Sequence, residues 1–421
     1  MNWTEKDKKY IWHPFTQTAL TDNLPVITHG KGALLWDEND KEYIDAISSW
    51  WVNIHGHANP YISKKIAQQA KKIEQVIFAG FTHQPAIELA ERLNQKLPNG
   101  FSRIFYSDNG STSVEVAIKM AIQYWYNLGN PKTKIIALTN AYHGDTFGAM
   151  SIGERGLFNR PFESMFFEVE FIDPTKPKEA IKKINKLAKS GDLAAFIYEP
   201  LIQGSGGMVF YEPKLLDELI SISKSHSIIC IADEVMTGFY RTGKFLASNH
   251  LINQPDIICL SKGLTGGFLP LGITACRDYI FDAFTSKDKL KTFFHGHSYT
   301  ANPLSCAAAL ASLDLIDRPN FEPQIRKIEN QHANFIVQLK SLKIVENPRV
   351  LGTILSFEVK NDENTSYFNN IRDLLYKKFI ENGILLRPLG NTIYIMPPYV
   401  ITHFQLQKVY KTILKVLAGI A

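Results

Sequence analysis

Short apolar runs alternate with longer segments of helical periodicity through most of the chain. The runs are Arg103–Ser107, Lys134–Leu138, Ala195–Tyr198, Ile228–Ala232, Ile257–Leu260 and Gly272–Cys276. Short apolar runs of this kind are typical of buried strands. Their alternation with helices predicts an α/β fold, with a mainly parallel sheet and helices on both of its faces.

The segment between the first two runs has the spacing of an amphipathic helix. Its apolar residues repeat every three or four positions, at Val114, Ile118, Ala121, Ile122 and Trp125. This stripe predicts a helix that begins near Ser111.

The pattern changes after about residue 318, which predicts a second domain. Residues 319–421 contain amphipathic helices, weaker strands around Thr353–Val359 and Thr392–Met396, and a terminal helix from Thr402. We expect a smaller α+β domain there and a large domain over 53–318. The opening segment, 1–52, carries strand-like stretches at Gly32–Asp37 and Glu42–Asp45, and we expect it to pack on the smaller domain.

Composition is that of an ordinary globular protein. The chain has 421 residues, 45% of them hydrophobic, which is enough for a large core. Its net charge of +5 is spread along the chain, so it gives little support to a nucleic-acid partner. The charged segment Met1–Tyr10 and the absence of a long apolar stretch favour a cytoplasmic protein without a membrane partner. Four cysteines lie in apolar segments, and we expect them to be reduced core residues: Cys230, Cys259, Cys276 and Cys306.

Asp233 and Lys262 each follow an apolar run, where a buried strand gives way to a loop. Ligand sites of open α/β sheets lie outside the carboxyl ends of the strands, so both side chains are candidates for one site. An amine forms a Schiff base with the aldehyde of pyridoxal phosphate, and a carboxylate keeps the pyridine nitrogen protonated. A salt bridge or two unrelated charges would be the simpler interpretation of this pair alone.

Two further segments suit a phosphate and an aromatic ring. Residues Ser107–Ser113 place glycine and hydroxyl groups at the start of the predicted helix, which suits an anion site and equally suits a simple helix cap. Tyr142 follows the run Lys134–Leu138, and its ring has the shape to stack on a pyridine, with Val235 covering the opposite face. A packed loop aromatic is the alternative for Tyr142.

The remaining motifs are less informative. Glu199–Met208 is rich in glycine, but the residues after it do not begin a helix, so a dinucleotide loop is rejected in favour of an active-site loop or a turn. The pairs His55/His57 and His295/His297 lack accompanying carboxylates or cysteines at ligand spacing, so no metal is expected. Arg387, between apolar residues, suits either a substrate carboxylate or an internal ion pair.

Together these segments resemble the class III aminotransferases, pyridoxal-phosphate enzymes of fold type I, over nearly the whole chain. Further segments look like the branch of that family that aminates 8-amino-7-oxononanoate in biotin biosynthesis. These segments are Ile11–Thr16, Ser48–Trp51, Ile54–Gly56, Thr82–Leu89, Tyr142–Ser151, Leu264–Gly267 and Ile393–Tyr399.

The resemblance implies a role for individual residues. Lys262 corresponds to the Schiff-base lysine and Asp233 to the partner of the pyridine nitrogen, and Tyr142 is counted with them as catalytic. The cofactor phosphate would be held by Gly110, Ser111 and Thr112, with His297 and Ser298 supplied by the neighbouring subunit of a homodimer whose active sites lie at the interface. Besides Tyr142 and Lys262, the substrate would contact Phe15, Trp50, Trp51, Gly296, Arg387 and Tyr394. Arg387 would bind the carboxylate of the acceptor.

Phe15 departs from this branch, which usually has tyrosine at that position. The tyrosine hydroxyl is associated with recognition of S-adenosyl-L-methionine, and a site that loses such a partner loses discrimination. S-adenosyl-L-methionine is the expected amino donor, and lysine is the alternative. A class III aminotransferase for another ω-amino acid or ornithine is a competing hypothesis, and so is a binding protein that kept the fold without catalysis.

Overall fold

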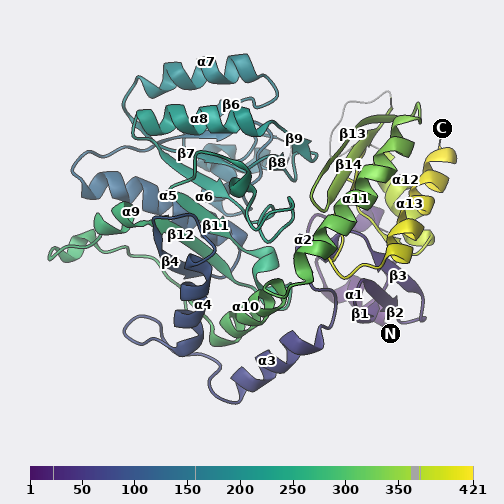
Figure 1. The fold of residues 1–421 in the computed structure, drawn as a ribbon. Coiled ribbons are helices and arrows are strands. Elements are labelled where there is room, and N and C mark those ends of the chain that lie inside the picture. The colour runs from purple at the N-terminus through teal and green to yellow at the C-terminus, as the bar shows by residue number, and fades with distance from the viewer. Residues whose placement is uncertain (22, 157, 362–368, 370, 421) are drawn as a thin grey trace.

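A computed structural model describes the whole chain except residues 22, 157, 362–368, 370 and 421 (Figure 1). Its largest sheet has seven strands in the order β4-β12-β11-β10-β7-β5-β6. Strand β12 runs antiparallel to both of its neighbours, and the pairs β11–β10, β10–β7, β7–β5 and β5–β6 are parallel. The strands are β4 (Phe101–Ser107), β5 (Lys134–Leu138), β6 (Val169–Ile172), β7 (Leu193–Tyr198), β10 (Ile229–Asp233), β11 (Ile257–Leu260) and β12 (Gly272–Arg277).

The predicted α/β fold with a mainly parallel sheet is confirmed, and the six predicted runs are all strands. Strand β6 was not predicted, because its short sequence has a charged residue in the middle and shows little apolar character. The four cysteines are buried and unpaired, as expected.

Both faces of this sheet are buried, and alternate residues of each strand belong to different cores. Ile135, Ile197 and Ile231 pack in the core that contains the apolar stripe of α5 (Gly110–Asn127). Ile136 and Phe196 pack in the core that contains α8 (Pro213–Ser225). Burial on both faces explains why these strands are continuous apolar runs in the sequence.

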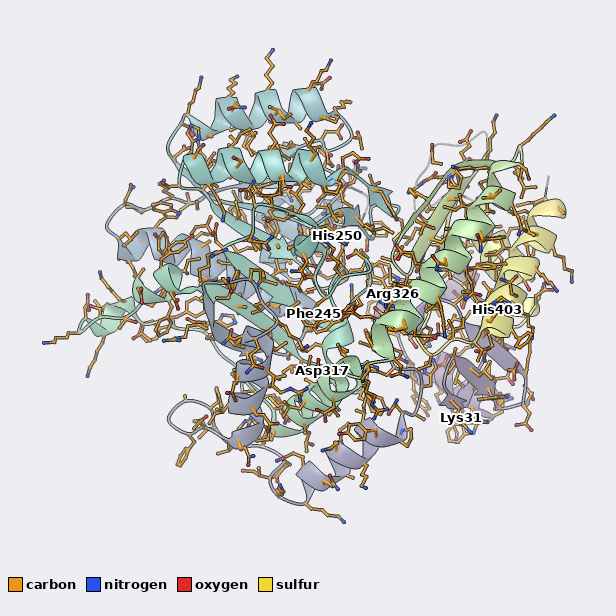
Figure 2. The ribbon with its side chains drawn as sticks, viewed as in Figure 1. Lys31, Phe245, His250, Asp317, Arg326 and His403 are labelled. Carbon is orange, nitrogen blue, oxygen red and sulfur yellow. The ribbon has the colours of Figure 1, made fainter. Side chains whose placement is uncertain are left out.

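Further helices surround the sheet. They are α3 (Pro60–Ala70), α4 (Gln84–Asn94), α6 (Phe147–Ser151), α7 (Pro177–Ala188), α9 (Asp278–Asp282) and α10 (Pro303–Ile316). Asp317, labelled in Figure 2, follows α10 and accepts hydrogen bonds from Arg92 at 2.8 Å and Lys96 at 2.5 Å, which ties α10 to α4. A small hairpin of β8 (Ile202–Gln203) and β9 (Val209–Phe210) encloses the glycine-rich segment, which is therefore a turn between strands.

The C-terminal elements form a second lobe. Strands β13 (Val345–Leu351), β14 (Ile354–Val359) and β16 (Thr392–Ile395) make an antiparallel sheet. The helices there are α11 (Phe321–Lys340), α12 (Ile371–Glu381) and α13 (His403–Ala418), and Thr402 caps α13 as the sequence predicts.

The N-terminal elements lie beside this second lobe (Figure 1). Strands β1 (Ile27–Lys31), β2 (Leu34–Asp37) and β3 (Glu42–Asp45) form a sheet with β15 (Ile384–Leu385), and β3 pairs with β15 in parallel. Helix α1 (Trp3–Tyr10) precedes them, and α2 (Ser48–Trp51) leads from β3 toward the large sheet. The domain boundaries at 52/53 and 318/319 stay a prediction. Of the helices in the described part of the chain, none is long and apolar enough to span a bilayer.

Candidate active site

Asp233 and Lys262 lie at the same edge of the large sheet. Strand β10 ends at Asp233, which stands opposite Cys259 of the parallel strand β11. Strand β11 ends at Leu260, and Lys262 opens a short 3-10 turn, Lys262–Thr265. The carboxyl ends of two adjacent parallel strands therefore present an acid and an amine side by side, as the sequence predicted.

The Asp233 carboxylate is buried, and each of its two oxygens has a hydrogen-bond partner. Its Oδ2 lies 2.7 Å from Nδ1 of His143, and its Oδ1 accepts a hydrogen bond from the backbone N–H of Val235 at 3.1 Å. His143 is buried as well. His143 was not among the predicted site residues, because in the sequence only its position next to Tyr142 distinguishes it. This contact fixes the direction of the Asp233 carboxylate.

The Lys262 amine is tuned toward its neutral form. Burial lowers its pKa to about 8, while the carboxylates of Asp233 and Glu199 favour the ammonium form and the Arg241 guanidinium disfavours it. Its Nζ lies 4.5 Å from the centre of the Trp51 ring. The residue also has a positive φ of 45°, an unusual backbone conformation that is common at functional sites. A lysine with this pKa is a far better nucleophile and base near neutral pH than an exposed one.

Glu199 is a second buried acid that sequence analysis treated only as the start of a glycine-rich loop. Its two carboxylate oxygens accept hydrogen bonds from the backbone N–H groups of Tyr142 at 3.0 Å and Gly204 at 2.9 Å. Burial raises its pKa to about 7; His143 lowers it and Asp233 raises it further. Glu199 thus joins the loop that carries Tyr142 to the β8–β9 hairpin.

Tyr142 is held at its backbone by Glu199 and at its hydroxyl by Asp145, to which it donates a hydrogen bond of 2.9 Å. Burial first, and then the Asp145 charge, raise the pKa of the phenol, so Tyr142 stays neutral. A neutral ring fixed at both ends is suited to stacking on a flat aromatic ligand.

The start of α5 packs closely against Val235. A Cβ atom added at Gly110 would lie 2.7 Å from Cγ1 of Val235, so only glycine fits between the helix and this side chain. The first N–H groups of a helix have no partner within it and attract anions. Ser111 Oγ accepts a hydrogen bond of 3.3 Å from the backbone N–H of Asp145, which places this hydroxyl at the same edge.

Thr112 has a different local role from Ser111. The helix cap is Asn109, whose side chain accepts a hydrogen bond from the Thr112 N–H at 3.0 Å. The Thr112 hydroxyl accepts from the Asn109 N–H at 3.1 Å and donates to Asp108 at 2.7 Å. The helix-cap interpretation is confirmed for Asn109 and Thr112, and the anion site at Gly110 and Ser111 stays a prediction.

Aromatic and charged residues from distant segments meet at the two tryptophans, of which Trp51 contacts Lys262. Trp51 is buried and donates a hydrogen bond of 3.0 Å from Nε1 to the hydroxyl of Tyr394. Trp50 is half exposed, and the Arg387 guanidinium lies 5.2 Å from its ring centre. Phe15 packs edge-on against Trp50 at 5.7 Å between ring centres. The structure thus brings together five of the predicted substrate residues.

Gly296, His297 and Ser298 lie in another environment. The His297 N–H donates to the Thr300 hydroxyl at 3.0 Å, and the Ser298 carbonyl accepts a hydrogen bond of 2.6 Å from Gln75. A Cβ added at Gly296 would come within 3.7 Å of Thr300. These contacts belong to the loop before α10 and the segment after α3.

The remaining histidines of the sequence motifs bond to different groups. His55 lies 2.9 Å from the Ser312 hydroxyl, and burial lowers its pKa to about 3. His57 lies 2.8 Å from Asp45. In the described part of the chain, no three histidine, cysteine or acidic side chains gather in a way that would hold a metal ion.

Comparisons with known proteins agree with this geometry. A family model described as aminotransferase class-III matches residues 17–417. The chain is 48% identical over 419 residues to the adenosylmethionine-8-amino-7-oxononanoate aminotransferase of Synechococcus elongatus, with 97% of this chain and 98% of that relative covered. The protein of the same name from Helicobacter pylori is 36% identical, with 99% of each chain covered.

Solved structures give the same family. The aminotransferase of that name from Methanocaldococcus jannaschii has a TM-score of 0.95 at 34% identity, covering 99% of this chain and 98% of that chain. An amine transaminase from an uncultivated Pseudomonas species, solved in a PLP-bound form, has a TM-score of 0.91 at 28% identity, covering 97% and 98%. With its lysine, acid and glycine-opened helix in one place and its full length matched, this chain belongs to the class III aminotransferases.

Proposed function

We propose that this aminotransferase uses pyridoxal phosphate to transfer an amino group from S-adenosyl-L-methionine to 8-amino-7-oxononanoate, which yields 7,8-diaminononanoate for biotin synthesis. The observation that carries the chemistry is the pair of Lys262 and Asp233 at adjacent strand ends. The name of the relatives that match over nearly their full length supports the choice of substrates.

The residues at the sheet edge fit the cofactor. Bound pyridoxal phosphate supplies an aldehyde that amines attack and a ring that takes up electrons. Asp233, oriented by His143, is placed to hold a pyridinium proton. The open N-terminus of α5 suits the phosphate, with Gly110, Ser111 and Thr112 at its first turn, and Tyr142 and Val235 are assigned to the two faces of the ring.

Lys262 is the catalytic base and acid. With a pKa of about 8, its amine carries a proton only part of the time near neutral pH, so it both accepts and returns one. Asp233 and Glu199 offset the charge of the ammonium form when Lys262 is protonated. The side chain is therefore suited to moving a proton between the two carbons that exchange the amino group.

The substrate contacts follow from the cluster around Trp50 and Trp51. Arg387 is assigned to the acceptor carboxylate, since a guanidinium binds a carboxylate with two parallel hydrogen bonds. The faces of Trp50, Trp51 and Tyr142 attract a positive charge, which suits the sulfonium of the donor. Tyr394, Phe15 and Gly296 complete the assigned substrate residues.

The assembly we infer is a homodimer in which His297 and Ser298 of each subunit reach the phosphate of the other. Two segments support this inference, the one after α3 and the one before α10. They are in contact, because the Asn302 side chain donates a hydrogen bond of 3.0 Å to the carbonyl of Glu74. Both segments also carry large apolar side chains that are exposed. These are Ile77 at 63%, Phe81 at 66%, Phe294 at 70% and Tyr299 at 66% exposure. We assign these exposed apolar side chains to the surface that meets the second chain. The cytoplasmic location stays a prediction.

The decisive experiment is amine analysis after incubation with donor and acceptor. Wild-type enzyme is expected to form 7,8-diaminononanoate and to show an absorption band near the visible edge that changes on addition of a true donor. Lys262→Ala is expected to remain folded by circular dichroism and to make no product. Product from Lys262→Ala, or preference for ornithine or another ω-amino acid as substrate, would refute the proposal.

Phe15 favours a second candidate for the donor. Its ring is flanked edge-on by Trp50 and Phe158, so an apolar surface stands where a hydroxyl would otherwise recognise a polar donor. Lysine is the alternative donor. The two are separated by comparing the change in the absorption band with each donor, and a Phe15→Tyr variant is expected to shift preference toward S-adenosyl-L-methionine.

A further inference from the structure

The turn Ser48–Trp51 carries both tryptophans of the candidate site and has an unusual backbone. The φ angles of Ser48, Ser49 and Trp51 are 52°, 58° and 68°. Ser49 combines its φ with a ψ of −96°, a conformation that glycine tolerates and most residue types disfavour. Backbone strain of this kind persists only where the surroundings hold it in place.

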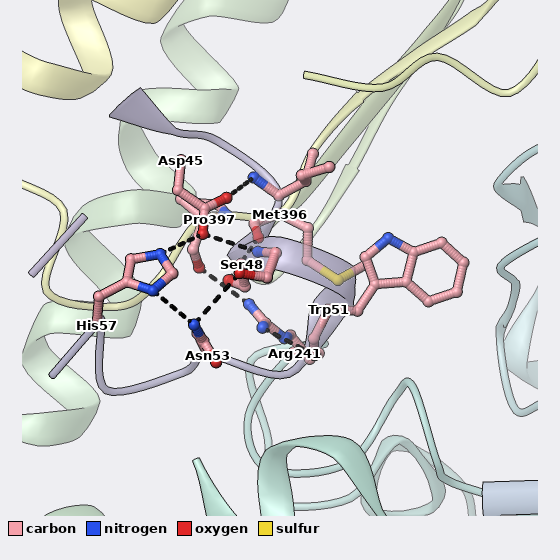
Figure 3. Close-up of polar contacts among 10 residues, drawn as sticks. Asp45, Ser48, Trp51, Asn53, His57, Arg241, Met396 and Pro397 are labelled. Carbon is pink, nitrogen blue, oxygen red and sulfur yellow. Dashed lines mark hydrogen bonds and ion pairs between the residues drawn. The ribbon is translucent and has the colours of Figure 1, made fainter. Parts of the chain in front are cut away.

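Ser49 belongs to a closed ring of hydrogen bonds, whose other members, Asp45, Asn53 and His57, are labelled in Figure 3. Its N–H donates 2.7 Å to Oδ2 of Asp45, which also lies 2.8 Å from Nε2 of His57. Asn53 closes the ring, because its Nδ2 lies 2.8 Å from Nδ1 of His57 and 3.3 Å from the Ser49 hydroxyl. We name Asp45, Ser49, Asn53 and His57 the turn clamp.

Asp45 is the anchor of the turn clamp. The residue is 0% exposed, and its second oxygen accepts a hydrogen bond of 3.1 Å from the N–H of Ile47. A buried carboxylate without partners is very costly, so these three donors hold the backbone on either side of Ser48 against Asp45.

A second group holds the other end of the turn. Arg241 is buried and donates from Nη2 to the Trp51 carbonyl at 3.2 Å and from Nη1 to the Pro397 carbonyl at 2.9 Å. The Ser48 hydroxyl donates 2.8 Å to the Met396 carbonyl. Figure 3 shows these contacts beside the turn clamp, with the Trp51 ring directed away from them.

The turn directs the rings of Trp50 and Trp51 toward different neighbours. Trp51 enters the buried space beside Gly204, where two of its ring atoms would lie 3.2 and 3.3 Å from an added Cβ, and it reaches Lys262 and Tyr394. Trp50 points to Arg387 and Phe15. A change in the torsions of Ser49 would therefore move one ring or both out of these contacts.

From these contacts we propose that the turn clamp positions Trp50 and Trp51 and thereby sets the affinity of the enzyme for its amino acceptor. Asp45, Ser49, Asn53 and His57 act through the tryptophans and are positioning residues. The inference rests on the proposed function for the identity of the acceptor, and on the geometry of the turn for the positioning.

The test uses Ser49→Gly, which removes the strain and one side-chain contact without leaving a buried charge unpaired. Asp40→Gly is its control, because Asp40 is exposed and also has a positive φ, of 59°, in the turn before β3. Both variants are expected to keep or raise the melting temperature. Only Ser49→Gly is expected to raise the KM for the acceptor, by about tenfold, with a smaller change in kcat.

A second measurement needs no substrate. The six tryptophans are replaced biosynthetically by 5-fluorotryptophan, and the fluorine resonances of Trp50 and Trp51 are assigned from Trp50→Phe and Trp51→Phe variants. Ser49→Gly and His57→Leu are expected to shift or broaden these two resonances and to leave that of Trp125 unchanged. His57→Gln, whose amide both donates and accepts, is expected to retain more acceptor affinity than His57→Leu.

Unchanged resonances of Trp50 and Trp51 in both variants, or an unchanged acceptor KM in Ser49→Gly, would overturn the proposal. A melting temperature that falls together with acceptor affinity in Ser49→Gly would indicate a purely structural role and would also overturn it. If wild-type enzyme does not aminate 8-amino-7-oxononanoate, the proposed function fails, whereas the fluorine measurement still decides whether the turn clamp positions the tryptophans.

Discussion

His143 Nδ1 lies 2.7 Å from Oδ2 of Asp233, and both side chains are buried at the end of β10. An acid that must hold a proton on a ring nitrogen needs a defined direction as well as a charge. His143 supplies that direction, and the backbone N–H of Val235 holds the other oxygen. These two contacts hold the Asp233 carboxylate in one orientation at the candidate cofactor site.

Replacement of His143 is expected to weaken catalysis without abolishing it. His143→Phe leaves one oxygen of a buried carboxylate without its partner, which costs about 1–3 kcal/mol of folding stability. The kcat/KM is expected to fall as well, because Asp233 loses the contact that orients it. His143→Asn places an amide near the position of Nδ1 and is expected to retain more activity. Steady-state kinetics of the two variants check this, and equal activity of His143→Phe and wild type would contradict it.

The lowered pKa of Lys262 predicts a pH-dependent stability of the cofactor-free protein. The folded-state pKa of about 8 lies below the ordinary value of 10.5, so the folded protein gives up a proton that the unfolded chain keeps between these pH values. The unfavourable contribution of Lys262 is therefore complete below about pH 8 and fades as the pH approaches 10.5. Lys262→Met is expected to melt at a higher temperature than wild type at pH 7.

The advantage of Lys262→Met should shrink as the pH rises above 8, measured by thermal unfolding of both proteins across this range. Because both proteins share every titrating group except this one, their difference isolates Lys262. A difference that stays constant from pH 7 to pH 10 would show that burial does not lower this pKa.

Gly110→Ala is expected to reduce cofactor affinity by about tenfold or more, since the added methyl group meets Val235 at 2.7 Å and relief of such overlap costs about 1–3 kcal/mol. Gly156→Ala is the matched control, because a Cβ there meets no atom within 4 Å. Titration of cofactor-free protein with pyridoxal phosphate measures both. Equal affinity of Gly110→Ala and Gly156→Ala would argue against close approach of the cofactor to this helix.

Arg387→Lys is expected to raise the KM for the acceptor by roughly tenfold with a smaller effect on kcat, because lysine keeps the charge and loses two-point binding of a carboxylate. The control is Arg326→Lys on α11, an exposed arginine labelled in Figure 2 that lies 3.5 Å from Glu322. Initial rates at varied acceptor concentration give both constants. An unchanged KM would remove Arg387 from the acceptor site.

Much of the site was accessible from local pattern. Asp233 and Lys262 were found because each follows an apolar run, and a run buried on both sides of a parallel sheet needs no tertiary information to be recognised. The apolar stripe that begins at Val114 predicted a helix start near Ser111, and the helix begins one residue earlier, at Gly110. A resemblance in motifs such as Ser48–Trp51 gave the candidate substrate side chains. The structure brings Trp50 to Arg387 and Trp51 to Tyr394 from segments more than 330 residues apart.

Some buried polar groups around the candidate site had no local signal in the sequence. Glu199 looks like an ordinary loop acid, and Arg241 and Asp45 like ordinary surface charges, until their burial and partners are known. His57 looks like half of a metal motif, and its ring is instead bonded to Asp45 and Asn53.

The sequence by itself determined the order of the chemical groups along the chain, that is, which residues end a strand, which open a helix and which family of enzymes shares them. These features depend on neighbours within a few positions, because the periods of strands and helices are local. Only the tertiary structure decided which carboxylates are buried, which bases face them, and which contacts hold Ser49 in its strained conformation. The protonation state of a buried group depends on its distance to groups from remote segments and on the exclusion of water. Neither can be obtained from the order of residues alone, because both depend on how the chain folds.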